Sequence, residues 1–432
     1  MYRKITMAAA VTAVAALALA GCSGTSTTTP SATLDNSPVK LTMSAWNLAA
    51  TPTNEFKALA DAFTAEHPNV TIELKDYDAA KYPTLVTADL AAGTATDLIT
   101  IKTVVDVVPW AEGGQLADVS DVKIGDGVKG GASYNVDGKQ YAIPYRLDGN
   151  VIYYNKDLFK AAGVADPDGT WTWDDYVAAA EKLKTGLAAA GSKALPAYQH
   201  GWNTLTQNFA TVQTGNDVLK GDFSYMKPYY ERTLKMQADG LQLPLATVTA
   251  NKTTYQAQFG KQSAAMEIMG TWYVSTLVAQ QAKGDADKFA WGIAPAPQKD
   301  AAATKAPVTF GDPTGIAINA KLEGNKLAAA KAFLAFIESE KGASKLAAMA
   351  ITPAFINDAV TAAYFGLAGV PTDDLSKKAW SGQKILPQNL PNAKQPVANT
   401  ALVAMHSAIL TGSGDIDKAI ADAQAQFKNS AG

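Results

Sequence analysis

The chain has 432 residues, of which 47% are hydrophobic and 18% are charged, a balance typical of a folded protein rather than a disordered one. This length allows one large domain or two to three ordinary ones. The formal net charge is −3 and lysine and arginine form no long basic run, which argues against a nucleic-acid partner. The chain has one cysteine, which excludes an intramolecular disulfide.

The N-terminus has the pattern of an export signal. Arg3 and Lys4 precede an apolar stretch, 5–20, that is shorter than the roughly 20 residues of a transmembrane helix. The stretch leads into a Leu-Ala-Gly-Cys motif at 19–22, which resembles the lipobox of bacterial lipoproteins. The resemblance implies that residues 1–21 are a lipoprotein signal peptide and that Cys22 is lipidated. An ordinary secreted protein with a stray cysteine is the alternative.

The segment after the motif predicts a tether. Residues 22–38 are rich in serine and threonine, cannot build a core and should be flexible. Acyl chains on Cys22, palmitate among them, would hold the protein at the extracytoplasmic face of the bacterial cell membrane. Because the tether cannot build a core, the folded body is expected to start near Pro38. No later segment of the sequence is apolar enough to span a bilayer.

Strand and helix patterns alternate in the next 60 or so residues. Apolar residues recur with period two or form short runs in the predicted strands, and lie at i, i+3, i+4 and i+7 in the predicted helices. The order is that of βαβ units, which predicts a mainly parallel sheet with ligands beyond the carboxyl ends of its strands. The predicted strands are 40–46, 70–74 and 98–101, and the predicted helices are 55–66 and 81–92, the second ending at Gly93.

Turn and cap signals organise the following part of the chain. Asp137-Gly138 predicts a hairpin between 134–136 and 140–143. Thr172, with Asp175 three residues later, predicts a capping arrangement at the start of a helix. Further elements are expected as a buried strand at 151–155 and as helices at 173–187, around 329–337 and at 416–427.

Several short motifs follow one another in a fixed order along the chain. The most specific are Tyr-Ala-Ile-Pro at 141–144 and the segment 153–163, which begins Tyr-Tyr-Asn-Lys-Asp-Leu-Phe. Weaker ones are Ala91-Ala92-Gly93 with Thr96-Asp97-Leu98, Thr172-Trp173-Asp174-Asp175, Phe259-Gly260-Lys261, Gly270-Thr271-Trp272, 292–297 and Ile385-Leu386-Pro387. In this order they resemble the family of bacterial extracellular solute-binding proteins that includes maltose-binding protein. The resemblance runs from the first strand to the last helix.

The resemblance implies an α/β fold of the two-lobe, periplasmic-binding-protein type, with a cleft between the lobes and a crossover hinge. Lobe I would comprise 39–146 and 309–352, and lobe II 150–305 and 355–427. A crossover at 146–150 is reasonable because the strands on its two sides would belong to different sheets. Gly149 would add backbone freedom there.

The resemblance also implies a ligand site in the cleft. A sugar has flat C–H faces that stack on aromatic rings and hydroxyls that bind planar polar side chains. Trp272 is similar to the family's stacking tryptophan, and Gly270 before it would let the backbone approach a ligand. A core tryptophan behind the cleft is the alternative.

Further candidate ligand-binding residues lie at strand ends, at the crossovers or in loops. The alternatives are buried packing for the aromatic residues, a salt bridge or solvent for the charged ones, and turn formation for the aspartate near the second crossover. These candidates are Trp46, Asn47, Lys102, Arg146, Asp148, Trp202, Asp312 and Asn399.

One stretch departs from the family pattern. Maltose-binding relatives place an aromatic residue in the cleft from a C-terminal helix, whereas 395–400 contains none. Asn399 would hydrogen-bond a hydroxyl instead, and Trp380 is a further candidate substitute. The departure puts a long malto-oligosaccharide in doubt and leaves room for a smaller or differently linked sugar.

The function implied is that of a substrate-binding lipoprotein of an ABC importer, which binds a carbohydrate and delivers it to permease subunits as a monomer. No catalytic residue, metal or cofactor is expected, and the chain lacks the Gly-x-x-x-x-Gly-Lys-Ser/Thr loop of an ATPase. The sequence has only three histidines, and they are far apart, which argues against a zinc site: His67, His200 and His406. The alternatives are a peptide, polyamine, metal or sugar phosphate as the solute, and a surface glycoside hydrolase, whose paired carboxylates the sequence does not exclude.

Overall fold

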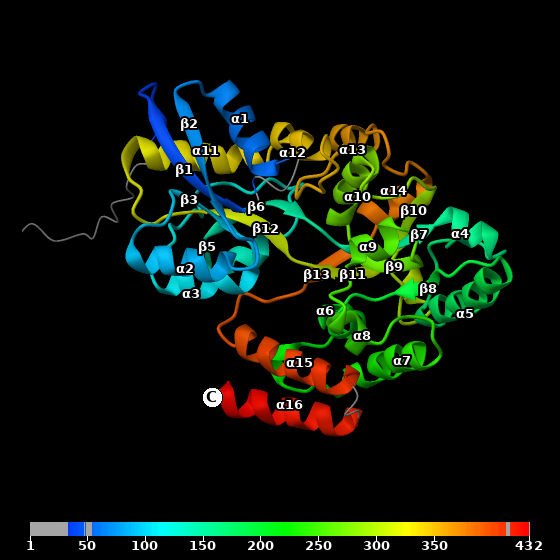
Figure 1. Cartoon of the computed structure of the whole chain (residues 1–432). Coiled ribbons are helices and arrows are strands. Elements are labelled where there is room, and N and C mark those ends of the chain that lie inside the picture. The colour runs from blue at the N-terminus through cyan, green and yellow to red at the C-terminus, as the bar shows by residue number, and fades with distance from the viewer. Residues whose placement is uncertain (1–32, 47, 49–53, 412–414, 432) are drawn as a thin grey trace, which may run out of the picture. The chain divides into compact units, whose positions relative to one another are not determined.

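Two β-sheets organise the part of the chain that the structure, a computed structural model, describes: residues 33–46, 48, 54–411 and 415–431 (Figure 1). The first sheet has the order β2 (Val70–Tyr77), β1 (Val39–Trp46), β3 (Leu98–Ile101), β12 (Pro313–Ile318), β6 (Ala142–Leu147). The second has the order β10 (Trp291–Pro295), β7 (Asn150–Asn155), β9 (Ala264–Gly270), β8 (Leu195–Tyr198). Two small sheets pair β11 (Val308–Gly311) with β13 (Lys384–Pro387) and β4 (Asn135–Val136) with β5 (Lys139–Gln140).

Helices pack against both large sheets and bury a separate apolar core on each. Those that follow the strands of the first sheet are α1 (Glu55–Glu66), α2 (Tyr82–Ala92), α3 (Val107–Glu112), α11 (Gly324–Ile337) and α12 (Glu340–Ala347). The others are α4 (Lys156–Ala161), α5 (Trp173–Ala189), α6 (Thr204–Thr214), α7 (Lys227–Ala238), α8 (Leu245–Ala250), α9 (Tyr255–Gly260), α10 (Trp272–Lys283), α13 (Asp358–Phe365), α14 (Asp374–Ser381), α15 (Gln395–Leu410) and α16 (Ile416–Ser430). None of the described helices has the length and apolar character that crossing a membrane requires.

The strand directions correct the prediction of a mainly parallel sheet. β1 is parallel to β2 and to β3, as the βαβ order predicts. However, β12 is antiparallel to both β3 and β6, and in the second sheet only β8 and β9 are parallel. The prediction fails beyond β3 because β12 enters the first sheet directly from the neighbouring strand β11, without the helical crossover that parallel strands need.

The local signals of the sequence are confirmed. Gly93 ends α2 in the left-handed conformation with φ of 72°. Asp137 and Gly138 both have positive φ, 50° and 79°, as a type I′ hairpin turn requires. The hydroxyl of Thr172 accepts from the backbone of Asp175, whose carboxylate accepts from the backbone of Thr172, so that α5 begins with a capping box.

Backbone segments cross between the two sheets in close contact. The chain passes from β6 to β7 through Asp148 and Gly149, and from β11 to β12 through Asp312 (Figure 1). A Cβ atom at Gly311 would lie 1.9 Å from the carbonyl oxygen of Asp148, so only glycine permits this approach. Beside them, the Leu147 amide donates to the carbonyl of Thr352 at 3.3 Å. The β6–β7 and β11–β12 connections therefore lie close together, and the β6 end also contacts the segment at Thr352.

Candidate functional site

A cavity of about 670 Å³ lies where the carboxyl ends of β1 and β3 and the strand β6 face α6, α9 and α10. Its volume is in the range of small-molecule sites. The lining residues come from both large sheets and from the crossing segments: Trp46, Lys102, Thr103, Arg146, Asp148, Asn150, Trp202, Asn203, Thr204, Tyr255, Trp272, Phe310, Gly311, Asp312, Thr314 and Gln388. Seven of the predicted ligand-binding residues are among them: Trp46, Lys102, Arg146, Asp148, Trp202, Trp272 and Asp312. Their role in binding stays a prediction.

Three aromatic rings form one wall of the cavity. Trp272 is the first residue of α10, Tyr255 is the first residue of α9, and Trp202 lies in the loop before α6. The Trp202 ring centroid is 6.3 Å from that of Trp272 and 5.9 Å from that of Tyr255. Trp202 is 41% exposed, which is unusual for a tryptophan and leaves its surface open to the cavity. The ring of His200 supports it edge-on at 4.5 Å.

The structure explains why a glycine is needed at position 270, and the reason was not evident from the sequence. A Cβ atom at Gly270 would lie 1.8 Å from the indole of Trp272. The ring of Trp272 therefore folds back over its own backbone, and Gly270 makes room for that ring. This differs from the expectation that Gly270 lets the backbone approach a ligand.

A fourth aromatic ring lies at the end of β1. Trp46 packs edge-on against Phe56 at 4.8 Å and against Tyr82 at 4.9 Å, which fixes its orientation. The ammonium group of Lys102 is 5.4 Å from the Trp46 ring and donates to the carbonyl of Ala79. Burial lowers the pKa of Lys102. Lys102 is thus held in the cavity wall by these contacts rather than free in solvent.

Arg146 is the centre of a buried ionic network. Its Nη1 donates to both carboxylate oxygens of Glu55, at 2.8 and 2.9 Å, and its Nε lies 3.3 Å from the carboxylate of Asp148. Tyr145 donates to Glu55 at 2.6 Å, and the Thr271 hydroxyl donates to Asp148 at 2.8 Å. The predicted alternative of a salt bridge for Arg146 and Asp148 is therefore present, and both residues still line the cavity.

The pKa values in this network follow from burial and pairing. Burial opposes the charge of Arg146, but the carboxylates of Glu55 and Asp148 outweigh it and raise the pKa of Arg146. Burial also raises the pKa of Asp148, against the opposing effects of Arg146 and of the hydrogen bond from Thr271. Each charge of the network is therefore stabilised by the oppositely charged groups in it.

Asp312 closes the cavity at the second crossover. Its carboxylate accepts from the backbone amides of Gln388 and Asn389 at 2.9 and 3.0 Å and from the Asn389 side chain at 2.6 Å. Burial raises the pKa of Asp312 to about 6, against these hydrogen bonds. Asn399 does not line the cavity: its amide donates to the Asn389 side-chain oxygen at 2.9 Å, so it acts on Asp312 through one intermediate.

Three further expectations have different outcomes. Trp380 is 3% exposed, packs on Tyr364 and donates to Thr352, so it is a core residue and does not replace the missing aromatic of the cleft. Asn47 and the predicted lipidation site Cys22 both lie outside the described residues, and the structure does not test them.

The sequence reasoning missed part of the lining. Tyr255 lies in a Thr-Thr-Tyr segment whose only signal is a helix start, and Phe310 and Gln388 belong to short strands or their ends. Asn150 begins β7 and donates to the carbonyl of Phe310 at 3.1 Å. No local pattern in the sequence distinguishes these residues from ordinary core positions.

The arrangement suits reversible binding of a polar, flat molecule. The lining combines several aromatic rings from different elements with hydrogen-bonding groups from the crossing segments. Within the described residues no group of three or more histidine, cysteine or acidic side chains is placed to hold a metal ion. His406 is buried beside Tyr230, and burial lowers its pKa to about 4.

Comparison with known proteins adds to this geometry. Residues 49–344 match the profile of the bacterial extracellular solute-binding protein family. The chain is similar to the crystal structure of a sugar transporter from Rhizobium etli in an open conformation, with a TM-score of 0.80 and 31% identity, over 90% of this chain and 99% of that one. It also has the fold of an ABC substrate-binding protein of Listeria monocytogenes in complex with cycloalternan, with a TM-score of 0.73, 20% identity, and coverage of 91% and 99%.

Among curated sequences, a putative binding protein of Brucella abortus is 30% identical over 161 residues, which are 35% of this chain and 36% of that protein. The chain thus spans about a third of the length of that relative. The mixed α/β architecture and the match to two-lobe structures confirm the predicted fold class. The predicted lobe boundaries stay a prediction, as do the predicted roles of individual residues.

Proposed function

Because the chain belongs to the family of bacterial extracellular solute-binding proteins, a family of transport proteins rather than enzymes, we propose that it binds a carbohydrate in the cavity between its two lobes. The carbohydrate would be a monosaccharide or a short oligosaccharide. The proposal includes delivery of the sugar to the permease of an ABC importer, with the energy supplied by a separate ATPase. It also includes Trp46, Trp202 and Trp272 as the stacking residues.

One observation carries the proposal: the lining of the cavity combines several aromatic rings with charged and polar side chains. Trp202, Tyr255 and Trp272 lie on one side, and Trp46 lies at the end of β1. C–H faces of a sugar ring stack on such surfaces, while its hydroxyls need planar, fixed hydrogen-bonding partners. The Arg146 network supplies such a partner. Its guanidinium is fixed by Glu55, and Arg146 lines the cavity.

Binding would favour a closed arrangement of the lobes. A sugar that touches Trp46 on one side and Trp272 on the other gains both sets of contacts only when the two sides are close, so it shifts the equilibrium toward that state. The crossing segments at Asp148 and Gly311 are the places where the chain would bend. A smaller radius of gyration at saturating sugar, measured by small-angle scattering, supports this mechanism, and an unchanged radius contradicts it.

The proposed location is the extracytoplasmic face of the cell membrane. Cys22 would carry the lipid, and residues 22–38 would be the tether. Stable anchoring needs about two acyl chains, which the lipoprotein type of modification supplies. Cys22→Ala should move the chain from the membrane fraction to the soluble fraction. Equal partitioning of the variant and the parent chain would contradict the anchor.

A thermal-shift screen tests the ligand class. The full chain is heated with sugars, sugar phosphates, peptides and polyamines in turn, and a ligand at 100 times its Kd should stabilise it by about 2.7 kcal/mol. The expected result is stabilisation by sugars, without product formation. Stabilisation only by peptides or polyamines overturns the sugar assignment, and turnover of an oligosaccharide favours a hydrolase.

A pair of tryptophan variants locates the binding. Trp272→Ala should weaken sugar binding roughly tenfold to a hundredfold, because it removes a stacking surface. Trp171→Ala is the matched control, since Trp171 is also half-buried but lies outside the cavity lining. Equal affinity losses in both variants would place the sugar elsewhere.

A further inference from the structure

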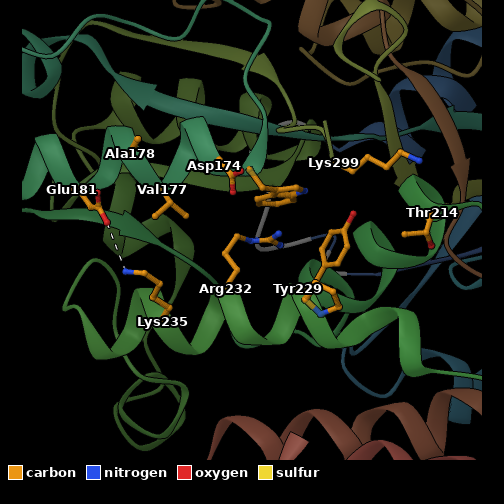
Figure 2. A pocket seen from close by; sticks show the side chains of 11 residues that line it. Asp174, Val177, Ala178, Glu181, Thr214, Tyr229, Arg232, Lys235 and Lys299 are labelled. Carbon is orange, nitrogen blue, oxygen red and sulfur yellow. Dashed lines mark ion pairs between the residues drawn. The ribbon is translucent and has the colours of Figure 1, made fainter. Parts of the chain in front are cut away.

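A second cavity, of about 530 Å³, lies between α5 and α7 (Figure 2). It shares no lining residue with the cavity between the lobes. Its wall contains two aromatic rings, three cations and two acids: Trp173, Asp174, Val177, Ala178, Glu181, Thr214, Pro228, Tyr229, Arg232, Lys235 and Lys299. The proposed sugar-binding function makes no use of this cavity.

The guanidinium of Arg232 is held between the two rings. Its central carbon lies 3.8 Å from the centroid of the Trp173 ring and 4.6 Å from that of Tyr229. Figure 2 shows the guanidinium pointing toward Tyr229 and away from Glu181 and Lys235. The rings stabilise the cation through their faces, so the N–H groups are left to point outward in the guanidinium plane.

The two rings are fixed before any ligand binds. Gln213 accepts from the indole nitrogen of Trp173 at 2.8 Å and from the hydroxyl of Tyr229 at 2.9 Å. The Gln213 amide in turn donates to the carbonyl of Pro297 at 2.6 Å. A single buried glutamine thus holds both rings that orient Arg232.

In the part of the chain that is described, Arg232 forms no direct ion pair, and the carboxylate of Asp174 attracts it only from a longer distance. No carboxylate forms an ion pair with it and no oxygen accepts a hydrogen bond from it, although Asp174 also lines the cavity. Its neighbour Lys235, by contrast, is paired with Glu181 at 3.8 Å and with Asp239. Burial lowers the pKa of Arg232 to about 10, so the guanidinium remains charged at neutral pH.

A half-buried guanidinium without a direct partner loses part of its hydration, and a ligand that pairs with it would offset that cost. Arginine has five N–H donors in a planar fork that matches a carboxylate or a phosphate. With Lys235 neutralised by its acids, Arg232 and Lys299 outnumber the remaining acid Asp174, so the cavity favours an anion.

We propose that the cavity between α5 and α7 is a second ligand site, which binds a small oxyanion, a carboxylate or phosphate group, through the free edge of the Arg232 guanidinium. The volume admits a small molecule that carries such a group. Lys299 provides a second positive charge at the wall of the site. The site does not depend on the proposed sugar-binding function.

Isothermal titration of the full chain with inorganic phosphate and, separately, with citrate tests the site, in Tris chloride buffer at constant ionic strength. The expected result is saturable binding of at least one of the two probes at one site. Arg232→Met keeps an apolar side chain between the rings and should weaken this binding roughly 10- to 100-fold. Arg232→Lys keeps the charge but loses the planar fork, so it should weaken binding less.

Lys418→Gln is the matched control, because Lys418 is an exposed cation of α16 that pairs with Asp422 and lies outside the cavity. Its affinity for the anion should equal that of the parent chain. Absence of saturable binding of both probes overturns the proposal, as does binding that survives unchanged in Arg232→Met. Binding of a tetraglutamate peptide but of neither small probe also overturns it, in favour of a protein-docking surface. A melting temperature of Arg232→Met close to that of the parent chain, measured without ligand, separates loss of this site from loss of the fold.

Discussion

The cavity between the lobes and the cavity between α5 and α7 each contain a partly buried arginine, and the two arginines have opposite surroundings. Arg146 meets the carboxylates of Glu55 and Asp148, and the side-chain exposures of these three residues are 20%, 13% and 7%. Arg232 meets the faces of Trp173 and Tyr229, with no acid bonded to it. The charge of Arg146 is balanced by acids of the same chain. The charge of Arg232 is not, which is why we propose that it binds an oxyanion.

A buried acid completes the comparison. Glu267, in the middle of β9, is fully buried, and neither of its carboxyl oxygens has a hydrogen-bond partner among the described residues. Burial raises the pKa of Glu267 well above its usual range. A carboxyl group can escape an unpaired charge by keeping its proton, whereas a guanidinium cannot. An unpartnered acid can therefore be enclosed in a core, but an unpartnered arginine must keep access to a cavity.

The largest effect is expected at Arg146. Arg146→Met would leave the carboxylates of Glu55 and Asp148 without their cation, which should lower the free energy of unfolding by about 3–5 kcal/mol. Urea unfolding at pH 7 measures this loss. Adding Glu55→Gln to the variant should restore part of the stability, because it removes one of the unpaired charges. A loss under about 1 kcal/mol would show that the network contributes little.

A smaller loss is expected at the crossing of the backbone segments. Gly311→Ala would place a Cβ atom 1.9 Å from the carbonyl oxygen of Asp148, so the two segments would have to separate. Overpacking of this kind costs about 1–3 kcal/mol, and sugar affinity should fall with it because Asp148 and Gly311 both line the cavity. Gly125→Ala is the control, since its Cβ would meet only a methyl group at 3.9 Å. Equal melting temperatures of the two variants would refute the close crossing.

Glu267 should produce a dependence of stability on pH. The folded chain keeps a proton that the unfolded chain releases above the usual pKa of 4.5, so the stability contributed is complete below that pH and is lost as the pH rises toward the folded pKa. The slope is at most about 1.4 kcal/mol per pH unit. Glu267→Gln has no proton to lose, so its melting temperature should exceed that of the parent chain at pH 8 and approach it near pH 4.5. Parallel curves for the two proteins would mean that Glu267 has found a partner.

The smallest change in stability is expected at Arg232. Arg232→Met removes a cation–π contact worth up to about 2 kcal/mol, but it also removes the desolvation cost of an unpaired guanidinium. The two effects should nearly cancel, within about 1 kcal/mol, when urea unfolding is measured without added oxyanion. A loss as large as that of Arg146→Met would show that Arg232 has a structural partner and would end the contrast between the two cavities.

The sequence predicted local structure well because its signals are local. Gly93 at a helix end, the Asp137-Gly138 turn and the Thr172 cap each act within a few residues, and each is confirmed. The direction of β12 was not predicted, because it depends on how the chain crosses between two sheets rather than on the period of its side chains.

Where family motifs or strand ends marked candidate residues, as at Trp46 and Trp272, the structure brings them to one cavity, and their role in binding stays a prediction. It missed Tyr255, and it chose Asn399, which lies one hydrogen-bonding partner away from Asp312. Trp380 looked available in the sequence and is enclosed in the core. Composition and spacing do not distinguish these outcomes, because each depends on the side of a helix or loop that meets the cavity.

By itself the sequence determined the first strands and helices in order, several caps and turns, and the family to which the motifs point. Only the tertiary structure decided that Arg146 is paired with Glu55, which is 91 positions away, and that Arg232 is paired with no acid in the described part of the chain. The physical reason is the separation along the chain over which each kind of interaction acts. Backbone preferences and apolar periods act over a few residues, whereas the pairing and desolvation of a charge depend on atoms that only folding brings within about 4 Å.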